Sequence, residues 1–400
     1  MHDEQTIERT GSDILGALAQ QPADPLLALI RAFRSDPRAN KIDVGVGVYR
    51  DHQGQTPVLR AVKQAERRLC DEQTSKGYLG AEGDIGFFEA LKPIIFGRVD
   101  HGDRLSGLQT VGGTGALRVA AELIARARPG ARAWVGNPTW PNHAPILKAA
   151  GLDMVGYDHF DVATQRLTFS RLLDALGEAA PGDVALLHGC CHNPTGADFD
   201  VEQWTEIAEL LRDRGVLPLI DFAYQGLGDG LEEDAAGLRI VLDIVGEGLI
   251  AYSCDKNFGL YRERVGALYA LSTSAAQAKI VQSNLLSLTR ANWSMPPDHG
   301  AAIVRVILED ATLTADWRLE LIEMAVRIRQ MRELLAEADP TLAPLARQRG
   351  MFSTLPLSPA DVARLCETRG IYMPSSGRIN VLGLTSETLA PFVDALASLR

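Results

Sequence analysis

The stretch Leu249-Ile250-Ala251-Tyr252-Ser253 is an apolar run that ends on a hydroxyl, and Cys254-Asp255-Lys256 follows it directly. A short apolar run of this kind predicts a buried strand. Three similar runs precede it, at residues 133–135, 184–188 and 217–221, with amphipathic segments between them. This alternation over residues 109–269 predicts a mostly parallel sheet with helices on both sides, and therefore an α/β fold.

The helical segments and the chain ends divide the sequence further. Residues 201–214 place their apolar side chains on one face, which predicts a helix, and a short amphipathic helix is expected over residues 26–33. A long helical stretch runs from His299 to about Ala338, with a break near residues 311–314. We expect an N-terminal arm, partly disordered, at residues 1–21. A large domain is expected at 56–310, and a smaller one from 22–55 together with 311–400, which includes the long helix between the domains.

Composition excludes several classes of protein. The chain has 400 residues, 46% of them hydrophobic and 23% charged, and a formal net charge of -11. That charge argues against nucleic acid or an anionic membrane as a partner. No apolar run is long enough to span a bilayer, and the N-terminus lacks a signal-peptide pattern. The five cysteines have neither zinc-like nor disulfide-like spacing, so a reduced, cytoplasmic enzyme is expected.

Lys256 and Arg264 indicate the chemistry. An amine can form a Schiff base with an aldehyde, and an arginine can bind a phosphate. The cofactor that carries both groups is pyridoxal phosphate, which withdraws electrons from a carbanion at the substrate α-carbon. For an isolated lysine in a charged loop, a plain surface position is the more common alternative. Polar residues at the ends of the other strands favour the cofactor-binding interpretation of Lys256.

A glycine-rich segment, Gly112-Gly113-Thr114-Gly115, opens a predicted helix after residues 109–111. Its glycines let backbone N–H groups approach an anion, and the helix dipole assists. Such a helix start taken alone is more often a simple turn.

The loop at residues 188–196 follows the second strand and contains Asn193, an amide donor suited to a ring oxygen. Its paired cysteines and two histidines raise the alternative of a metal. Adjacent ligands chelate poorly and the sequence has no second cluster, so no metal site is expected.

Asp221 ends the third strand, where a buried carboxylate is costly unless it is paired. A protonated pyridine nitrogen would pair it, and Tyr224 could donate to the phenolic oxygen of the cofactor. The alternative for Asp221 is a helix N-cap. After the first strand, Trp140 could stack on a heteroaromatic ring and His143 could orient Asp221, although a buried structural tryptophan is equally common.

Two arginines, Arg290 and Arg378, lie in distinctive segments. Arginine binds carboxylates with two parallel hydrogen bonds, so two such sites fit a substrate with two carboxylates. Each could instead form an ion pair at a domain interface.

Together these segments resemble the class I, fold-type I aminotransferases, in the branch of aspartate and aromatic amino acid aminotransferases. The resemblance covers nearly the whole chain from about residue 22, and its most specific motifs are Gly45-Val46-Gly47-Val48-Tyr49, residues 190–196 and residues 260–266. It implies a large domain with a mostly parallel, seven-stranded sheet between helices, a smaller α/β domain, and a homodimer with shared active sites. It also implies ping-pong transamination through a pyridoxamine phosphate form.

The resemblance assigns roles to individual residues. Lys256 holds the cofactor and moves the proton, while Asp221, Asn193, Tyr224 and Trp140 hold the ring. The phosphate ligands would be Gly113, Thr114, Ser253 and Arg264, with Tyr78 reaching the phosphate of the neighbouring subunit. Arg378 would bind the substrate α-carboxylate, Gly47 would line the lid, and Arg290 would cross the dimer interface to a side-chain carboxylate.

Asp255 and Met295 depart from the family pattern. The position before the lysine is usually a small residue, and a carboxylate there would favour a protonated lysine if the two side chains approached. Neighbouring side chains on an extended segment point apart, so a solvent- or backbone-bonded Asp255 is expected. Met295 and Gly77 would leave a roomier, less polar pocket, and the segments 293–300 and 372–378 look most like bacterial aromatic amino acid aminotransferases.

We therefore expect phenylalanine, tyrosine and possibly tryptophan as donors and 2-oxoglutarate as acceptor, with aspartate also accepted. A main aspartate/2-oxoglutarate pair is the alternative. The same fold hosts pyridoxal phosphate lyases and decarboxylases, but the two arginines favour transamination. A regulatory module would need an appended DNA-binding segment, which the short N-terminus does not offer.

Overall fold

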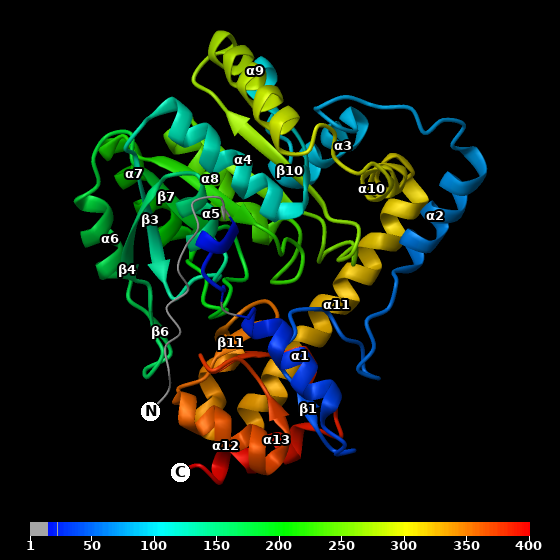
Figure 1. The fold of residues 1–400 in the computed structure, drawn as a ribbon, viewed down its shortest axis with the longest axis vertical. Helices are drawn as coiled ribbons and strands as arrows, with labels where there is room; N and C mark the ends of the chain where they lie inside the picture. Colours follow the sequence, from blue (N-terminus) through cyan, green and yellow to red (C-terminus); the bar gives the residue numbers. More distant parts are fainter. Residues whose placement is uncertain (1–14, 22) are drawn as a thin grey trace.

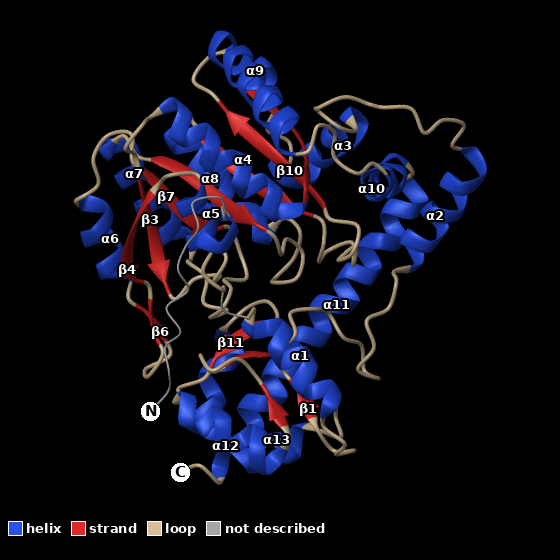
Figure 2. Cartoon of the chain, in the orientation of Figure 1, coloured by secondary structure: helices blue, strands red, loops and turns tan. Residues whose placement is uncertain are grey.

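The computed structural model describes residues 15–21 and 23–400. Its largest sheet has seven strands in the order β2-β10-β9-β8-β7-β3-β4, and Figure 2 shows it between two layers of helices. The bounds are β2 (Leu105–Val111), β3 (Arg132–Asn137), β4 (Asp153–Asp158), β7 (Val184–His188), β8 (Leu217–Phe222), β9 (Gly248–Ser253) and β10 (Val265–Leu271). The run from β9 to β4 is parallel, whereas β10 is antiparallel to both of its neighbours. The predicted seven-stranded, mostly parallel sheet is confirmed.

Both faces of this sheet are covered, because its strands are apolar on both sides. Leu186, Leu219 and Leu249 belong to one core cluster, with α4 (Gly112–Ala127), α5 (His143–Ala149) and α9 (Ala275–Asn292). Their neighbours Leu187 and Ile220 belong to a second cluster, with α6 (Phe169–Gly177), α7 (Val201–Arg214) and α8 (Ala236–Val245). Alternate residues of one strand therefore enter two different cores.

The C-terminal elements form a smaller unit with the start of the chain. β1 (Ile42–Asp43) pairs in parallel with β12 (Ile371–Tyr372), and β11 (Phe352–Thr354) pairs in antiparallel fashion with β13 (Arg378–Asn380). Figure 1 shows α1 (Pro25–Ser35), in blue, in the same lower unit as α12 (Pro359–Arg369) and α13 (Leu389–Ala397), in orange and red. Residues from both ends of the chain thus share one unit.

A long helix connects this unit to the large sheet (Figure 1). α10 (His299–Glu309) is followed by Asp310, and α11 (Ala311–Ala338) begins directly after that residue. The Asp310 carboxylate accepts hydrogen bonds from the backbone N–H groups of Thr312 and Leu313, at 2.8 and 3.0 Å, and so caps α11. The break therefore comes at Asp310, just before the predicted interval 311–314, because an aspartate serves better as an N-cap than within a helix.

The remaining elements are α2 (Arg60–Glu72), α3 (Ile85–Phe96), the hairpin of β5 (Phe160–Asp161) and β6 (Arg166–Leu167), and 3-10 turns. The four strands predicted from apolar runs all form, with ends shifted by at most two residues, and the helix predicted at 201–214 forms over those residues. The prediction of an N-terminal arm lies largely outside the described residues, of which Leu15–Ala17 form an exposed 3-10 turn. In the described part of the chain, no helix has both the length and the apolar character needed to cross a bilayer.

Candidate active site

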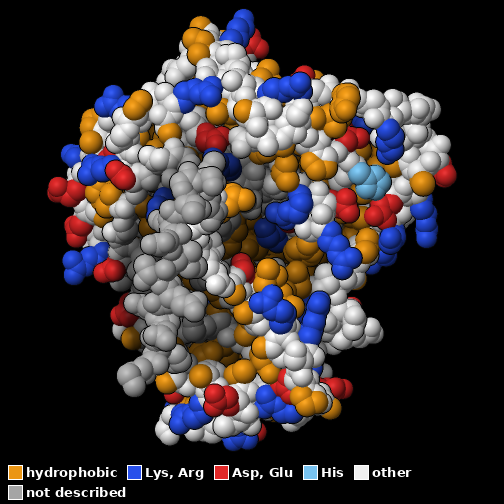
Figure 3. Space-filling view, viewed as in Figure 1, with side chains coloured by type: hydrophobic (Ala, Val, Ile, Leu, Met, Phe, Trp, Pro, Cys, Tyr) orange, Lys and Arg blue, Asp and Glu red, His pale blue; other side chains and the backbone are white. Residues whose placement is uncertain are grey.

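A cavity of about 340 Å³ lies where the parallel strands end, and Lys256 is one of its lining residues. Most of the predicted site residues also line it: Gly47, Gly113, Thr114, Trp140, Asn193, Asp221, Tyr224, Ser253, Arg264 and Arg378. The space-filling view shows a recess between the sheet and the C-terminal unit, with hydrophobic and basic side chains at its rim (Figure 3). Ligands of open α/β folds bind at this edge of the sheet.

Lys256 follows β9 in a turn that places its side chain over the Tyr224 ring, with Nζ 5.2 Å from the ring centre. Burial lowers the pKa of Lys256, and the Arg264 charge lowers it further, while the carboxylates of Asp255 and Asp221 oppose the shift. The net pKa lies below the ordinary value for lysine. A lysine with a lowered pKa is more readily available as the neutral amine that attacks a carbonyl.

Asp221 lies at the end of β8 and contacts His143, whose Nε2 lies 3.0 Å from Oδ2 of the carboxylate. The chain of contacts continues through Thr139 Oγ1, 2.8 Å from His143 Nδ1 and 3.1 Å from His188 Nε2. Burial raises the pKa of Asp221, but the hydrogen bond with His143 and the charge of nearby groups such as Lys256 outweigh it, so the net pKa is lowered. Asp221 is therefore a buried carboxylate held in its charged form, with His143 behind it as expected.

The start of α4 forms a close-fitting cradle with the end of β9 and the segment before β10. Gly112 has φ +64°, and a Cβ there would come within 2.8 Å of Nη2 of Arg264. A Cβ on Gly113 would come within 3.1 Å of Cβ of Ser253. Side chains are thus excluded at the helix N-terminus, where free N–H groups and an arginine are brought together. This arrangement fits a phosphate group.

Two buried polar atoms in the cavity are left for a ligand. Within residues 15–21 and 23–400, neither Oδ1 of Asn193 nor Nε of Arg378 has a hydrogen-bond partner. The amide of Asn193 faces the Tyr224 hydroxyl, 3.4 Å from its Nδ2. Arg378 lies over the Phe352 ring, 4.7 Å from its centre, and donates through Nη2 to the Gly45 carbonyl at 2.7 Å. Buried polar groups are normally paired, so these atoms indicate ligand contacts.

The loop that carries Asn193 is also tied to β11. The Arg349 N–H donates to the Gly196 carbonyl at 2.7 Å, and the Thr354 hydroxyl donates to the Pro194 carbonyl at 3.0 Å. A Cβ on Gly196, which has φ +69°, would come within 2.4 Å of the Phe352 carbonyl. The loop at the end of β7 therefore contacts the C-terminal unit through backbone groups.

Asp255 differs in part from expectation. Its side chain is buried, so the solvent-bonded alternative is wrong. Oδ1 accepts a hydrogen bond from the Val265 N–H at 3.1 Å, as the backbone-bonded alternative requires. Its other oxygen forms an ion pair with Nη1 of Arg264, which the sequence did not suggest. Burial raises the pKa of Asp255, whereas the charges of Lys256 and Arg264 lower it.

Tyr78 and Arg290 do not line this cavity. The Tyr78 side chain is 95% exposed, and the exposed Arg290 donates through Nη1 to the Ser294 hydroxyl at 2.6 Å. Neither residue reaches Lys256 within one chain. Both were expected to act across a dimer interface, which a single chain does not test.

Sequence reasoning missed several residues of the cavity wall. The cavity is also lined by Leu26, Val46, Val48, Leu117, Tyr261 and Phe352. Phe352 supports Arg378, and the Tyr261 hydroxyl accepts a hydrogen bond from the Tyr49 N–H at 2.8 Å. Tyr49 and Tyr261 both lie in motifs that carry the family resemblance, and their place in these motifs could have marked them as residues near the cavity. Nothing in the sequence marks Phe352, because it is far from Arg378 along the chain.

In the described residues, 15–21 and 23–400, the side chains of Cys190, Cys191 and Asp234 lie close enough together to suit a metal ion. The Asp234 carboxylate already accepts hydrogen bonds from the N–H groups of Gly226, Gly228 and Asp229. Burial raises the pKa of the Cys190 thiol well above its ordinary value. A neutral thiol is a poor metal ligand.

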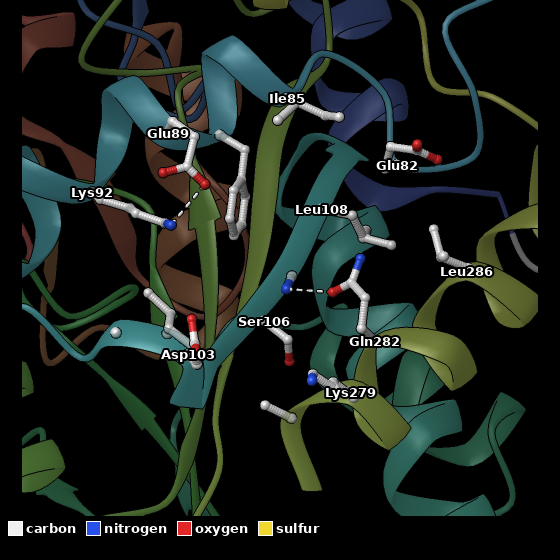
Figure 4. Close-up of a pocket in the computed structure, with 15 residues that line it drawn as sticks. Glu82, Ile85, Glu89, Lys92, Asp103, Ser106, Leu108, Lys279, Gln282 and Leu286 are labelled. Carbon is white, nitrogen blue, oxygen red and sulfur yellow. Dashed lines mark hydrogen bonds and ion pairs between the residues drawn. The ribbon is translucent and has the colours of Figure 1, made fainter. Parts of the chain in front are cut away.

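A larger hollow of about 500 Å³ lies beside β2, the outermost strand on one side of the sheet, between α3, β2 and α9 (Figure 4). Its lining includes the ion pair of Lys92 with Glu89, and Gln282, which accepts a hydrogen bond from the Gly107 N–H at 2.8 Å. The hollow contains none of the predicted site residues. We therefore take the cavity at Lys256 as the candidate active site.

The fold and this cavity together define a pyridoxal phosphate-type α/β enzyme, and comparison with known proteins narrows the class. Residues 39–396 match the family "Aminotransferase class I and II". The chain is 54% identical to a tyrosine aminotransferase of Rhizobium meliloti strain 1021, over 96% of this chain and 99% of that protein. It is 45% identical to an aspartate aminotransferase of Salmonella typhi, over 94% and 98% of the two chains.

A solved aromatic-amino-acid aminotransferase from Burkholderia pseudomallei, described as covalently bound to pyridoxal phosphate, superimposes with a TM-score of 0.94. It is 37% identical, and the match covers 96% of this chain and 99% of that one. The chain belongs to the class I and II aminotransferases. It is a pyridoxal phosphate-dependent enzyme of transamination, which acts on amino acids and keto acids.

Proposed function

We propose that this enzyme transfers the amino group of phenylalanine or tyrosine to 2-oxoglutarate, and that it also accepts aspartate. The observation that carries the aromatic preference is the apolar wall of the cavity, formed by Leu26, Val46, Val48 and Phe352. An aromatic side chain gains free energy when it is buried against such a wall. The names of the relatives include both aromatic and aspartate aminotransferases, so they do not decide between the two.

We further propose a separate role for each residue that contacts the cofactor. Bound pyridoxal phosphate supplies an electron sink for the substrate α-carbon. Lys256 would hold the cofactor and carry the proton, because its lowered pKa suits both tasks. Asp221 would keep the pyridine nitrogen protonated, and Asn193 and Tyr224 would hold the ring oxygen. Trp140 would stack on the ring.

The cradle at α4 would bind the phosphate through Gly113, Thr114, Ser253 and Arg264. Arg378 would bind the substrate α-carboxylate, since its Nε is buried without a partner in the described chain. Gly47 would line the entrance over Phe352, because a Cβ at Gly47 would come within 2.9 Å of that ring. We assign residues 56–310 to a large domain, and 22–55 with 311–400 to a small one.

Tyr78 and Arg290 can contribute to an active site only if that site is formed by two chains. We propose a homodimer in which Tyr78 reaches the phosphate in the neighbouring subunit, and Arg290 reaches the substrate side-chain carboxylate there. The support is the 95% exposure of Tyr78 and the distance of both residues from the cavity in one chain. A large exposed aromatic side chain is typical of an interface.

Subunit mixing tests the shared site. Lys256→Ala chains and Arg290→Ala chains are each expected to be nearly inactive towards a dicarboxylate. After unfolding and refolding together, about half of the dimers should be mixed, each with one intact site, so activity should return to about a quarter of wild type. Activity that stays at the sum of the two parents would contradict sharing.

A half-reaction tests the activity itself. The enzyme with bound cofactor is mixed with phenylalanine alone, and the products are separated. Transamination yields phenylpyruvate and pyridoxamine phosphate in equal amounts, whereas a lyase or decarboxylase would release ammonia or CO2. Lys256→Ala is the control, in which phenylpyruvate should not form. A panel of amino donors then gives the preference, and a kcat/KM for aspartate that exceeds that for phenylalanine by orders of magnitude would favour an aspartate aminotransferase.

A further inference from the structure

Asp255 lies beside both Lys256 and the anion cradle at the start of α4. It follows β9 and immediately precedes Lys256, and its side chain is 3% exposed. One carboxylate oxygen forms the ion pair with Arg264 Nη1, and the other accepts the Val265 N–H at 3.1 Å. The Asp255 carboxylate thus binds the side chain of Arg264 and also the backbone N–H of the next residue, Val265. Arg264 has φ +55°, a left-handed conformation that is unfavourable for a residue with a side chain. The ion pair and the hydrogen bond from Asp255 stabilise this backbone conformation.

The same carboxylate adjoins the anion cradle. A Cβ on Gly112 would lie 2.8 Å from Nη2 of Arg264 and 3.4 Å from Oδ2 of Asp255. The arginine fork therefore presents Nη1 to Asp255 and Nη2 to the start of α4. The planar guanidinium can serve two acceptors at once, because its N–H groups point in fixed directions. An anion at the start of α4 would share Arg264 with Asp255.

We propose that Asp255 is a positioning residue that acts as an internal counter-ion, shared by Arg264 and Lys256. It offsets part of the arginine charge at the anion cradle, and it supplies negative charge next to the lysine. Among the charges near Lys256, Asp255 raises the pKa of the lysine the most, ahead of Asp221, and Arg264 lowers it. This inference rests on the proposed cofactor site.

The groups that face Asp255 and Lys256 come from several elements. They are Asp221 at the end of β8, Tyr224 beyond it, Arg264 before β10, and Cys254 and Tyr261 on either side of the lysine turn. Replacement of Asp255 with Asn removes one negative charge from this set and alters the others least. The free amide oxygen can still accept the Val265 N–H.

The test uses Asp255→Asn and a matched control, Asp183→Asn. Asp183 is also a buried partner of an arginine, Arg132 at 2.6 Å, but it precedes β7 at the opposite end of the sheet. In each holoenzyme the absorbance of the lysine-bound cofactor is titrated against pH. The midpoint should fall by about one pH unit in Asp255→Asn, since loss of a nearby negative charge disfavours the protonated nitrogen. The control midpoint should match wild type.

A second measurement follows the arginine. Inorganic phosphate is titrated calorimetrically into the full chain from which cofactor has been removed. Phosphate should bind about threefold more tightly, or better, to Asp255→Asn, because the cradle then carries more net positive charge. A midpoint that does not fall, or phosphate binding that is not tighter, overturns the proposal. If Asp255→Asn does not fold, Asp255→Ser is measured against the same two criteria.

Failure of this inference is distinguishable from failure of the proposed function. A wild-type protein whose cofactor absorbance neither depends on Lys256 nor changes with pH would contradict the proposed cofactor site itself. A wild type that titrates and binds phosphate, beside an Asp255→Asn variant that behaves identically, would contradict only the role of Asp255.

Discussion

His143 Nε2 lies 3.0 Å from Oδ2 of Asp221, and both side chains are buried where the parallel strands end. Burial would raise the pKa of this carboxyl, but the hydrogen bond with His143 and the positive charge of nearby groups such as Lys256 more than offset it, so the pKa is lowered. A negative charge is thereby kept in a place from which water is largely excluded. Electrostatic groups fixed in this way are among the largest contributors to catalysis.

Asp221→Asn should reduce kcat by about 100- to 1,000-fold, because the amide cannot stabilise a positive charge on the cofactor ring. His143→Asn should reduce it by about tenfold, since the carboxylate remains but loses its support. Steady-state kinetics with saturating phenylalanine and 2-oxoglutarate measure both variants. Equal losses in the two variants would contradict a supporting role for His143.

Arg378→Lys should raise the KM for the amino acid by about 10- to 100-fold, because an ammonium group cannot form the paired hydrogen bonds to a carboxylate. Its effect should be the same for phenylalanine and aspartate, which share the α-carboxylate. Arg347→Lys, at the end of a 3-10 turn in the same unit, is the control. A loss confined to aspartate would instead assign Arg378 to the side-chain carboxylate.

Met295→Asn should raise the ratio of kcat/KM for aspartate over phenylalanine by about tenfold. Sδ of Met295 lies 3.2 Å from the Leu79 N–H, so residue 295 adjoins the exposed segment that includes Tyr78. An amide there adds a polar group where the thioether favours an apolar side chain. The ratio is measured with both donors at one concentration of 2-oxoglutarate, and an unchanged ratio would exclude residue 295 from the choice of substrate.

The stacked histidines predict an acid-sensitive fold. His159 and His192 stack with ring centres 4.2 Å apart, and burial lowers the pKa of His159 to about 4. The unfolded chain would bind a proton at this position below about pH 6.5 while the folded chain does not. Stability should therefore fall as the pH drops from about 6.5 towards 4, by about 1.4 kcal/mol per pH unit for each such histidine.

His159→Gln should make this pH dependence shallower, as seen in urea unfolding midpoints between pH 4.5 and about 7. His299→Gln, at an exposed position, is the matched control and should keep the wild-type slope. A His159→Gln protein with the wild-type slope would show that His159 titrates alike in both states.

Much of the sheet could be predicted, because its buried strands are apolar runs that end on polar residues such as Asp221 and Ser253. The antiparallel β10 could not be assigned a direction, since strand direction depends on how the chain returns after Lys256. Most residues of the cavity could be named because they follow strands whose ends meet at one edge. The ion pair of Asp255 with Arg264 was missed, because it depends on the left-handed backbone at Arg264, which the sequence does not reveal.

The backbone bonds between residues 194–196 and residues 349–354 have a mechanical consequence. Any rotation of the C-terminal unit that preserves them must pivot about this point, close to Asn193. Phe352 and Arg378 both lie next to this point and move little. Arg378 on β13 pairs directly with Thr354, whose hydroxyl makes one of these bonds, and its guanidinium lies 4.7 Å from the Phe352 ring centre. Such a rotation would keep Arg378 close to its position in the cavity, and it would displace the parts of the C-terminal unit that lie farther from this point.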